Sequence, residues 1–147
     1  AALTSLEHLR MFARQRGVEI LVENTLNDLS TPRRLLEFMD HTHMRDLKFC
    51  FDSGHAHLDG GVEEALELLH GRIASTHLHD NSGTKDEHLA PGDGKISWEK
   101  LVPALRAQSA DLPLLLEVRG SDANPVSLEN AAAAAVKLER IVEEASQ

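Results

Sequence analysis

Four short apolar runs, separated by segments with helical periodicity, constrain the fold of this chain more than any other feature. Near-continuous runs of Val, Ile, Leu and Phe of this length are typical of parallel strands that are covered on both faces. Their alternation with amphipathic stretches predicts an α/β fold with right-handed crossovers. The predicted strands cover residues 18–24, 47–52, 73–79 and 112–118.

Signals for helix starts support the segments between these runs. Residues 4–7 read Thr-Ser-Leu-Glu, a capping box that predicts the start of a first helix. Pro32 fits the first position of a second helix, where its missing N–H does least harm. Further helices are predicted over 62–70, over 97–108, and from about 125 or 127 onward. The order α-βα-βα-βα-βα fills residues 1–147 without a linker, so we expect a single domain.

Acidic or imidazole side chains stand at the carboxyl end of every predicted strand. They are Glu23, Asp52, His77 and Glu117, one in each βα repeat. In an open four-stranded sheet, which the chain length favours, these groups would lie in a row. Closing the strands into a barrel would instead gather them around one point. This convergence favours half of a TIM barrel, although a complete barrel normally has about 250 residues.

Two glutamates, one aspartate and one histidine at a single point repel one another unless a cation holds them. Oxygen-rich ligands with one imidazole suit Mn²⁺, Mg²⁺, Co²⁺ or Zn²⁺. We therefore expect a divalent metal site formed by Glu23, Asp52, His77 and Glu117. The alternative is that each is a solvated loop residue, which is a weaker interpretation for four groups in register.

The long polar loop after the third predicted strand carries further candidate ligands. Asp86 and His88 are two residues apart and could chelate one ion from an extended chain. His79 shares a strand face with His77, and His55 could face the same pocket from the turn after its strand. An ordinary polar loop with a Pro-Gly turn is the alternative for Asp86 and His88.

Composition narrows the possible partners and compartment. The chain has 15 basic against 24 acidic residues and a net charge of −9, which argues against a nucleic-acid partner. It contains no run of 18 apolar residues, so we expect no membrane span. The single cysteine, Cys50, lies in an apolar run and is interpreted as a core residue. One cysteine permits no internal disulfide and favours a reducing, cytoplasmic location.

Five motifs in order along the chain resemble the carboxyl-terminal half of the xylose isomerase-like barrel superfamily. This superfamily includes sugar-phosphate isomerases and epimerases, and the endonuclease IV repair enzymes. The resemblance covers nearly the whole chain and implies strands five to eight of an eight-stranded barrel. The motifs are Val-Glu-Asn at 22–24, Phe-Asp-Ser-Gly-His at 51–55, His-Leu-His-Asp-Asn at 77–81, Asp-Glu-His at 86–88 with Pro-Gly-Asp-Gly at 91–94, and Leu-Glu at 116–117.

The resemblance implies that the four strand-end residues hold one metal ion. In the epimerase branch the two glutamates also act as acid and base on opposite faces of the substrate, and His55 matches a residue that contacts a substrate oxygen. The endonuclease branch binds three zinc ions with further ligands that match His55, Asp86 and His88. Its remaining ligands lie in the first half of the family's barrel, so the ligand set here fits both branches.

Three functions remain open from the sequence. The first is a divalent-metal-dependent isomerase or epimerase of a sugar or sugar phosphate, in which Glu23 and Glu117 exchange the proton next to a carbonyl through an enediolate. Arg119 is the basic candidate for an anionic substrate group. The second is an endonuclease IV-like phosphodiester hydrolase with a multinuclear zinc site, which the scattered basic residues disfavour. The third is a non-catalytic half barrel that only binds metal.

Half a barrel would also leave two open parallel edges and an uncovered interior, which is a liability in water. We therefore expect these edges to be covered, either by an amino-terminal half barrel or by a second copy in a homo-oligomer. The sequence does not choose between the two.

Overall fold

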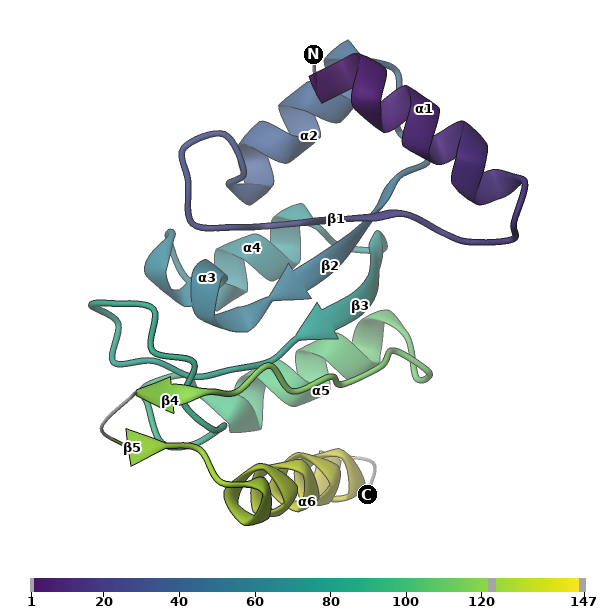
Figure 1. The fold of residues 1–147 in the computed structure, drawn as a ribbon. Coiled ribbons are helices and arrows are strands. Elements are labelled where there is room, and N and C mark those ends of the chain that lie inside the picture. Colours follow the sequence, from purple (N-terminus) through teal and green to yellow (C-terminus); the bar gives the residue numbers. More distant parts are fainter. Residues whose placement is uncertain (1, 122–123, 146–147) are drawn as a thin grey trace.

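The computed structural model describes residues 2–121 and 124–145, and a parallel sheet forms their centre (Figure 1). Its strands are β1 (Leu21–Glu23), β2 (Lys48–Asp52) and β3 (Ile73–His77), which lie side by side in chain order. In the register of the sheet, Glu23 pairs with Cys50 and Asp52 pairs with His77. A parallel sheet in chain order, with helical crossovers, confirms the predicted α/β fold.

Helices connect the strands, and successive helices pack against one another (Figure 1). Helix α2 contacts α4, α4 contacts α5, and α5 contacts α6. Their bounds are α1 (Ala2–Arg14), α2 (Pro32–His41), α3 (Ser53–Leu58), α4 (Val62–Leu68), α5 (Trp98–Gln108) and α6 (Leu128–Ala145). No helix in this part of the chain combines the length and the apolar composition that a membrane span requires.

Strand β2 divides the core from the candidate site. Phe49 and Phe51 are completely buried and belong to the apolar cluster that the helices cover. Cys50 and Asp52 alternate with them and therefore project from the opposite face of the sheet. They are also buried, at 7% and 0% exposure. Because side chains alternate between the two faces of a strand, Asp52 lies at the end of β2 on the face opposite Phe49 and Phe51.

Of two predicted helix starts, the one at Pro32 is confirmed and the one at residues 4–7 is wrong. Pro32 occupies the start of α2, as the sequence predicts, and the side chain of Thr31 caps this helix by accepting a hydrogen bond from the N–H of Arg34. The predicted capping box at 4–7 is wrong, because α1 already begins at Ala2 and those residues lie inside it. Ala2 and Leu3 have high helical propensity, so the helix begins before Thr4.

Helix α3 was not predicted, and it changes the position of His55. The Asp52 side chain accepts a hydrogen bond of 2.7 Å from the N–H of His55 and so caps this helix. His55 therefore lies on the first turn of a helix and not on a loop. With six residues, α3 is too short to show a helical period, and only the cap at Asp52 signals it.

The fourth predicted strand is wrong as a regular strand. Residues 112–118 run beside β3, but a single parallel bridge between Leu78 and Leu116 is formed. Pro113 lacks the N–H that a ladder requires. The hydroxyl of Thr76 replaces the missing pairing: it donates to Pro113 O over 2.8 Å and accepts from the N–H of Leu115 over 3.1 Å. The Thr76 hydroxyl and two backbone hydrogen bonds, from Leu78 N–H to Leu115 O and from Glu117 N–H to Leu78 O, therefore hold this segment in a strand-like position.

A small antiparallel pair follows that segment and was also not predicted. Strand β4 (Gly120–Ser121) pairs with β5 (Asn124–Pro125) before α6 begins. The element order among the described residues is thus α-βα-βαα-βα, then the bridged segment, the small hairpin and α6. This departs from the α-βα-βα-βα-βα order expected from the sequence.

Candidate metal site

The four strand-end residues predicted as metal ligands lie together. Glu23, Asp52 and His77 end β1, β2 and β3, and Glu117 follows the bridge that joins Leu116 to Leu78. One ligand atom from each of the four lies within 4.8 Å of every other. We call this group the strand-end cluster.

The histidine of the strand-end cluster lies between its two glutamates. Its Nδ1 is 3.3 Å from Oε2 of Glu23 and 2.8 Å from Oε2 of Glu117. This atom is buried and has no partner with hydrogen-bond geometry among the described residues. The side chains of His77 and both glutamates keep 29–46% of their surface exposed, so a small molecule can reach them. An imidazole nitrogen enclosed by carboxylates in this way can coordinate a cation.

The electrostatics of this cluster favour an added positive charge. Burial raises the pKa of the Glu23 carboxyl above its ordinary value; the imidazole of His77 opposes the shift, and the Asp52 carboxylate adds to it. A divalent cation would stabilise the ionised forms of all three carboxyl groups together.

Asp52 is fixed in place by contacts that sequence reasoning missed. The Asn24 side chain donates to the backbone oxygen of Asp52 and accepts from its N–H, both over 2.9 Å. The side-chain amide thus joins the ends of β1 and β2 where the backbone ladder stops. Asn24 is 2% exposed. The sequence offers one signal for its role in holding Asp52, namely that Asn24 directly follows the predicted ligand Glu23.

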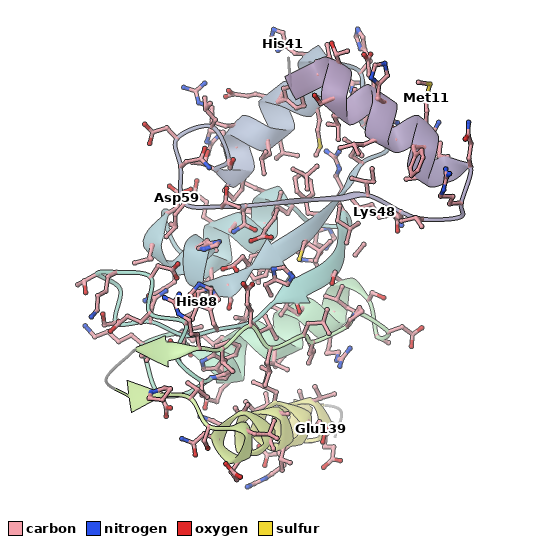
Figure 2. The ribbon with its side chains drawn as sticks, viewed as in Figure 1. Met11, His41, Lys48, Asp59, His88 and Glu139 are labelled. Carbon is pink, nitrogen blue, oxygen red and sulfur yellow. The ribbon has the colours of Figure 1, made fainter. Side chains whose placement is uncertain are left out.

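The further candidates His55, His79, Asp86 and His88 form a second group. One ligand atom from each lies within 4.8 Å of the others. Nε2 of His88 is 3.1 Å and Nε2 of His55 is 3.6 Å from Oδ2 of Asp86. We call this group the loop cluster. Figure 2 shows His88 beyond the carboxyl end of the strands, opposite Lys48 at the start of β2.

His79 is the most buried member of the loop cluster and contacts the strand-end cluster. It is completely buried, and its Nε2 lies 3.0 Å from Oδ1 of Asp52. Burial alone would lower the pKa of its imidazole, but the hydrogen bond and the charge of Asp52 outweigh burial, so this pKa is raised. The surroundings of His79 therefore favour the positively charged form of its ring.

The backbone places His88 in an uncommon conformation. Its φ is +49°, in the left-handed region that non-glycine residues seldom adopt. Nδ1 of the ring lies 3.0 Å from the backbone oxygen of Glu117, which leaves Nε2 facing Asp86. Strain of this kind persists where surrounding contacts over-determine it, and it is frequent at functional sites.

Asp80 organises the loop that carries Asp86 and His88, and no sequence pattern distinguishes it from its neighbours. It is completely buried, and its carboxylate accepts four hydrogen bonds. The donors are the N–H groups of Asn81, Gly92 and Ile96 and the indole of Trp98. One carboxylate therefore holds both ends of the loop, which explains why the loop is ordered without regular structure.

Two other residues considered from the sequence lie at the border of the site. Cys50 is buried, as predicted for a core residue, yet a third group of potential ligand atoms joins it to Glu23 and His77. Burial raises the pKa of its thiol to about 12. Arg119 is exposed and belongs to neither cluster; its backbone N–H donates to His88 O over 2.9 Å.

The family described as xylose isomerase-like TIM barrel matches residues 1–141. The chain belongs to this family. An uncharacterized protein of Methanocaldococcus jannaschii, MJ1311, is 31% identical over 121 residues, which is 78% of this chain and 41% of that protein.

Solved structures of this family share the fold. A D-tagatose 3-epimerase-like protein has a TM-score of 0.78 and 25% identity and is matched over 98% of this chain and 54% of its own. An L-ribulose 3-epimerase has a TM-score of 0.73 and 20% identity, with 98% and 55% matched. The chain therefore spans about half the length of these two barrel structures and less than half of MJ1311.

Proposed function

We propose that this chain is part of a divalent-metal-dependent sugar isomerase or epimerase. The observation that carries the proposal is the strand-end cluster, in which four ligand atoms from Glu23, Asp52, His77 and Glu117 lie within 4.8 Å of one another. The chain belongs to the xylose isomerase-like family. It is similar in structure to a D-tagatose 3-epimerase-like protein and to an L-ribulose 3-epimerase, and this similarity supports a small carbohydrate as substrate.

The residues present fit a bound cation. Three carboxylates and one imidazole are a donor set that suits Mn²⁺, Mg²⁺, Co²⁺ or Zn²⁺. Nδ1 of His77 is buried and lacks a hydrogen-bond partner within the described part of the chain, which an ion would satisfy. When bound, the cation would polarise the substrate carbonyl and stabilise negative charge on its oxygen.

The two glutamates are the groups that would move the proton. Glu23 and Glu117 reach the cluster from opposite ends of the row of strands, on either side of His77. In this role one carboxylate accepts the proton from the carbon next to the carbonyl and the other returns a proton to the opposite face. Asp52, which is buried and doubly fixed by Asn24, would hold the ion and not exchange protons.

A phosphodiester hydrolase with a multinuclear zinc site is the second candidate. The loop cluster favours it, because His55, His79, Asp86 and His88 could hold another cation beside the first. The net charge of −9 opposes it, since a duplex ligand requires a basic surface. We therefore place this function behind the isomerase, with a metal-binding half barrel that has no activity as the third possibility.

The remaining surface of the site requires a partner. Among the described residues β1 has a strand neighbour on one side only, so the sheet is open where a barrel would continue (Figure 1). We propose that further βα units complete the ring, either from an adjoining segment or from a second copy of the chain. A cytoplasmic location is part of the same proposal, since the single cysteine is buried and free.

Metal content and proton exchange test the proposed function. We expect elemental analysis with anomalous diffraction to find an ion on the strand-end cluster. We also expect a ketose such as D-tagatose to exchange its proton with deuterated solvent, and Glu117→Gln to abolish the exchange. Glu139→Gln, on an exposed position of α6 (Figure 2), is the matched control and should leave it unchanged. Two or more ions with abasic-duplex cleavage would support the hydrolase, and absence of any ion would refute both enzymes.

A further inference from the structure

Three buried side chains continue the hydrogen bonding of the sheet beyond its backbone ladders. Asn24 does so between β1 and β2, and Thr76 between β3 and the segment 112–118. Ser53 is the third, between β2 and β3, and it directly follows the candidate ligand Asp52. Each of the three both donates and accepts a hydrogen bond with the main chain of the neighbouring segment. One side chain therefore closes each joint between the segments that carry the strand-end cluster.

Ser53 takes over where the backbone ladder between β2 and β3 stops. The last pair in register is Asp52 with His77, and Ser53 is already the first residue of α3, so its backbone leaves the sheet. Its hydroxyl donates to His79 O over 2.8 Å and accepts from the N–H of His79 over 3.0 Å. Both residues are completely buried, so bulk water does not replace these bonds. One hydroxyl thus holds residues 77–79 in place for two residues past the end of the ladder.

The other side of this stretch holds Glu117. In a parallel sheet, the N–H and C=O of one residue point to one neighbouring strand, and those of the next residue point to the other. Whereas His79 faces Ser53, the completely buried Leu78 faces the opposite side. Its N–H donates to Leu115 O over 2.7 Å, and its oxygen accepts from the N–H of Glu117 over 3.0 Å. The backbone of Glu117 is therefore placed by the stretch that Ser53 holds.

The strand-end cluster depends on the relative position of His77 and Glu117. Nδ1 of His77 lies 2.8 Å from Oε2 of Glu117, and one ligand atom from each of the four cluster residues lies within 4.8 Å of every other. Ligand distances in metal sites deviate by only about 0.2 Å from their ideal values. A small shift of residues 77–79 would therefore move two of the four donors out of range of one ion.

Resting on the metal site proposed above, we propose that Ser53 is a positioning residue for the strand-end cluster. Its hydroxyl holds the main chain of residues 77–79 so that His77 and Glu117 reach the same point. It acts through main-chain hydrogen bonds, from His79 to Leu78 and from there to Glu117. Without the hydroxyl, two buried main-chain groups of His79 lose this partner, which favours a shift of the stretch.

Mn²⁺ binding, measured by calorimetry, compares the unchanged chain with Ser53→Ala and Val102→Ala. Val102 is a completely buried residue of α5, so its truncation lowers stability without removing a hydrogen bond at the strand ends. We expect Ser53→Ala to lower the affinity about 10- to 100-fold, as is typical when a partner that orients metal ligands is lost. Val102→Ala should leave the affinity unchanged. If Ser53→Ala keeps the affinity of the unchanged chain, or if both variants lose it equally, the role of Ser53 is refuted and the proposed function stands.

Amide hydrogen exchange without added metal provides a second measurement. The N–H of Glu117 is the reporter, and the N–H of Phe49, which donates to Arg72 O over 2.8 Å at the other end of the sheet, is the internal control. We expect Ser53→Ala to raise exchange at Glu117 about tenfold more than at Phe49. Equal increases at the two amides would mean that the hydroxyl only stabilises the fold, and the proposal would be wrong. If the unchanged chain binds no Mn²⁺, the proposed function fails, and these two amides alone decide whether Ser53 positions Glu117.

Discussion

The indole Nε1 of Trp98 donates a hydrogen bond of 2.8 Å to Oδ2 of Asp80, and both side chains are almost completely buried. This bond joins the first residue of α5 to the start of the loop that carries two candidate ligands. An aromatic residue of the core is therefore connected to the candidate site through one carboxylate.

Asp80→Asn should destabilise the protein by about 3 kcal/mol, because a side-chain amide cannot accept all four hydrogen bonds and charge-assisted bonds contribute about 1.5–3 kcal/mol each. Urea unfolding measures the change, and hydrogen exchange over residues 81–97 should rise. The exposed Asp93 lies in the same loop, so Asp93→Asn is the matched control. Equal effects of the two substitutions would contradict the role of Asp80.

Gly54→Ala should displace the His79 ring, because the added Cβ would lie 1.9 Å from Cε1 and 2.3 Å from Nδ1. We expect a loss of about 1–3 kcal/mol, typical of overpacking in a rigid core. A double-mutant cycle with His79→Ala checks the cause, since removal of the ring removes the clash. Strictly additive effects in that cycle would mean that the contact with His79 does not limit this position.

Thr76→Val should loosen the segment that replaces the fourth strand. Valine has nearly the shape of threonine but leaves Pro113 O and the N–H of Leu115 without their partner. The expected loss in the free energy of unfolding is about 2–3 kcal/mol. Thr76→Ser keeps the hydroxyl and should lose only about 1 kcal/mol for the buried methyl group. A valine variant more stable than the serine variant would overturn this account.

The raised pKa of the Cys50 thiol should make the protein less stable at high pH once a chelator has removed any metal. Burial raises the pKa of its thiol to about 12 in the folded chain, and the Glu23 charge adds to the shift. Above the unfolded pKa of about 8.5, the unfolded state gives up this proton and the folded state keeps it. The free energy of unfolding should then fall by about 1.4 kcal/mol per pH unit from this group alone.

Cys50→Ala is the comparison for that pH dependence. It should lower stability at neutral pH through the lost packing, and its stability should decline less steeply between pH 9 and 11 than that of the unchanged chain. The chain contains no tyrosine, which simplifies the comparison in this range. Parallel slopes for the two proteins would show that the thiol does not titrate with folding.

Much of the fold could be read from the sequence because its signals are local. The apolar runs predict four parallel strands, of which three form the sheet. The carboxylate or imidazole at the carboxyl end of each run predicts which side chains meet, since parallel strands end at one edge. Glu23, Asp52, His77 and Glu117 could therefore be grouped from their spacing alone, and the structure places their ligand atoms together. Their roles in metal binding and catalysis remain predictions.

Contacts between segments far apart in the chain required the tertiary structure. Residues 112–118 have the apolar pattern of a strand, yet Pro113 and the hydroxyl of Thr76 give them a different pairing. Likewise, nothing in the neighbourhood of Asp80 indicates that donors up to eighteen residues away converge on it. The alternation of strands and helices and the residue types at the strand ends follow from the sequence, because periodicity along a strand or helix is a local property. The position of His79 between the two clusters follows from the folded chain, because its neighbours depend on how a loop closes over the sheet.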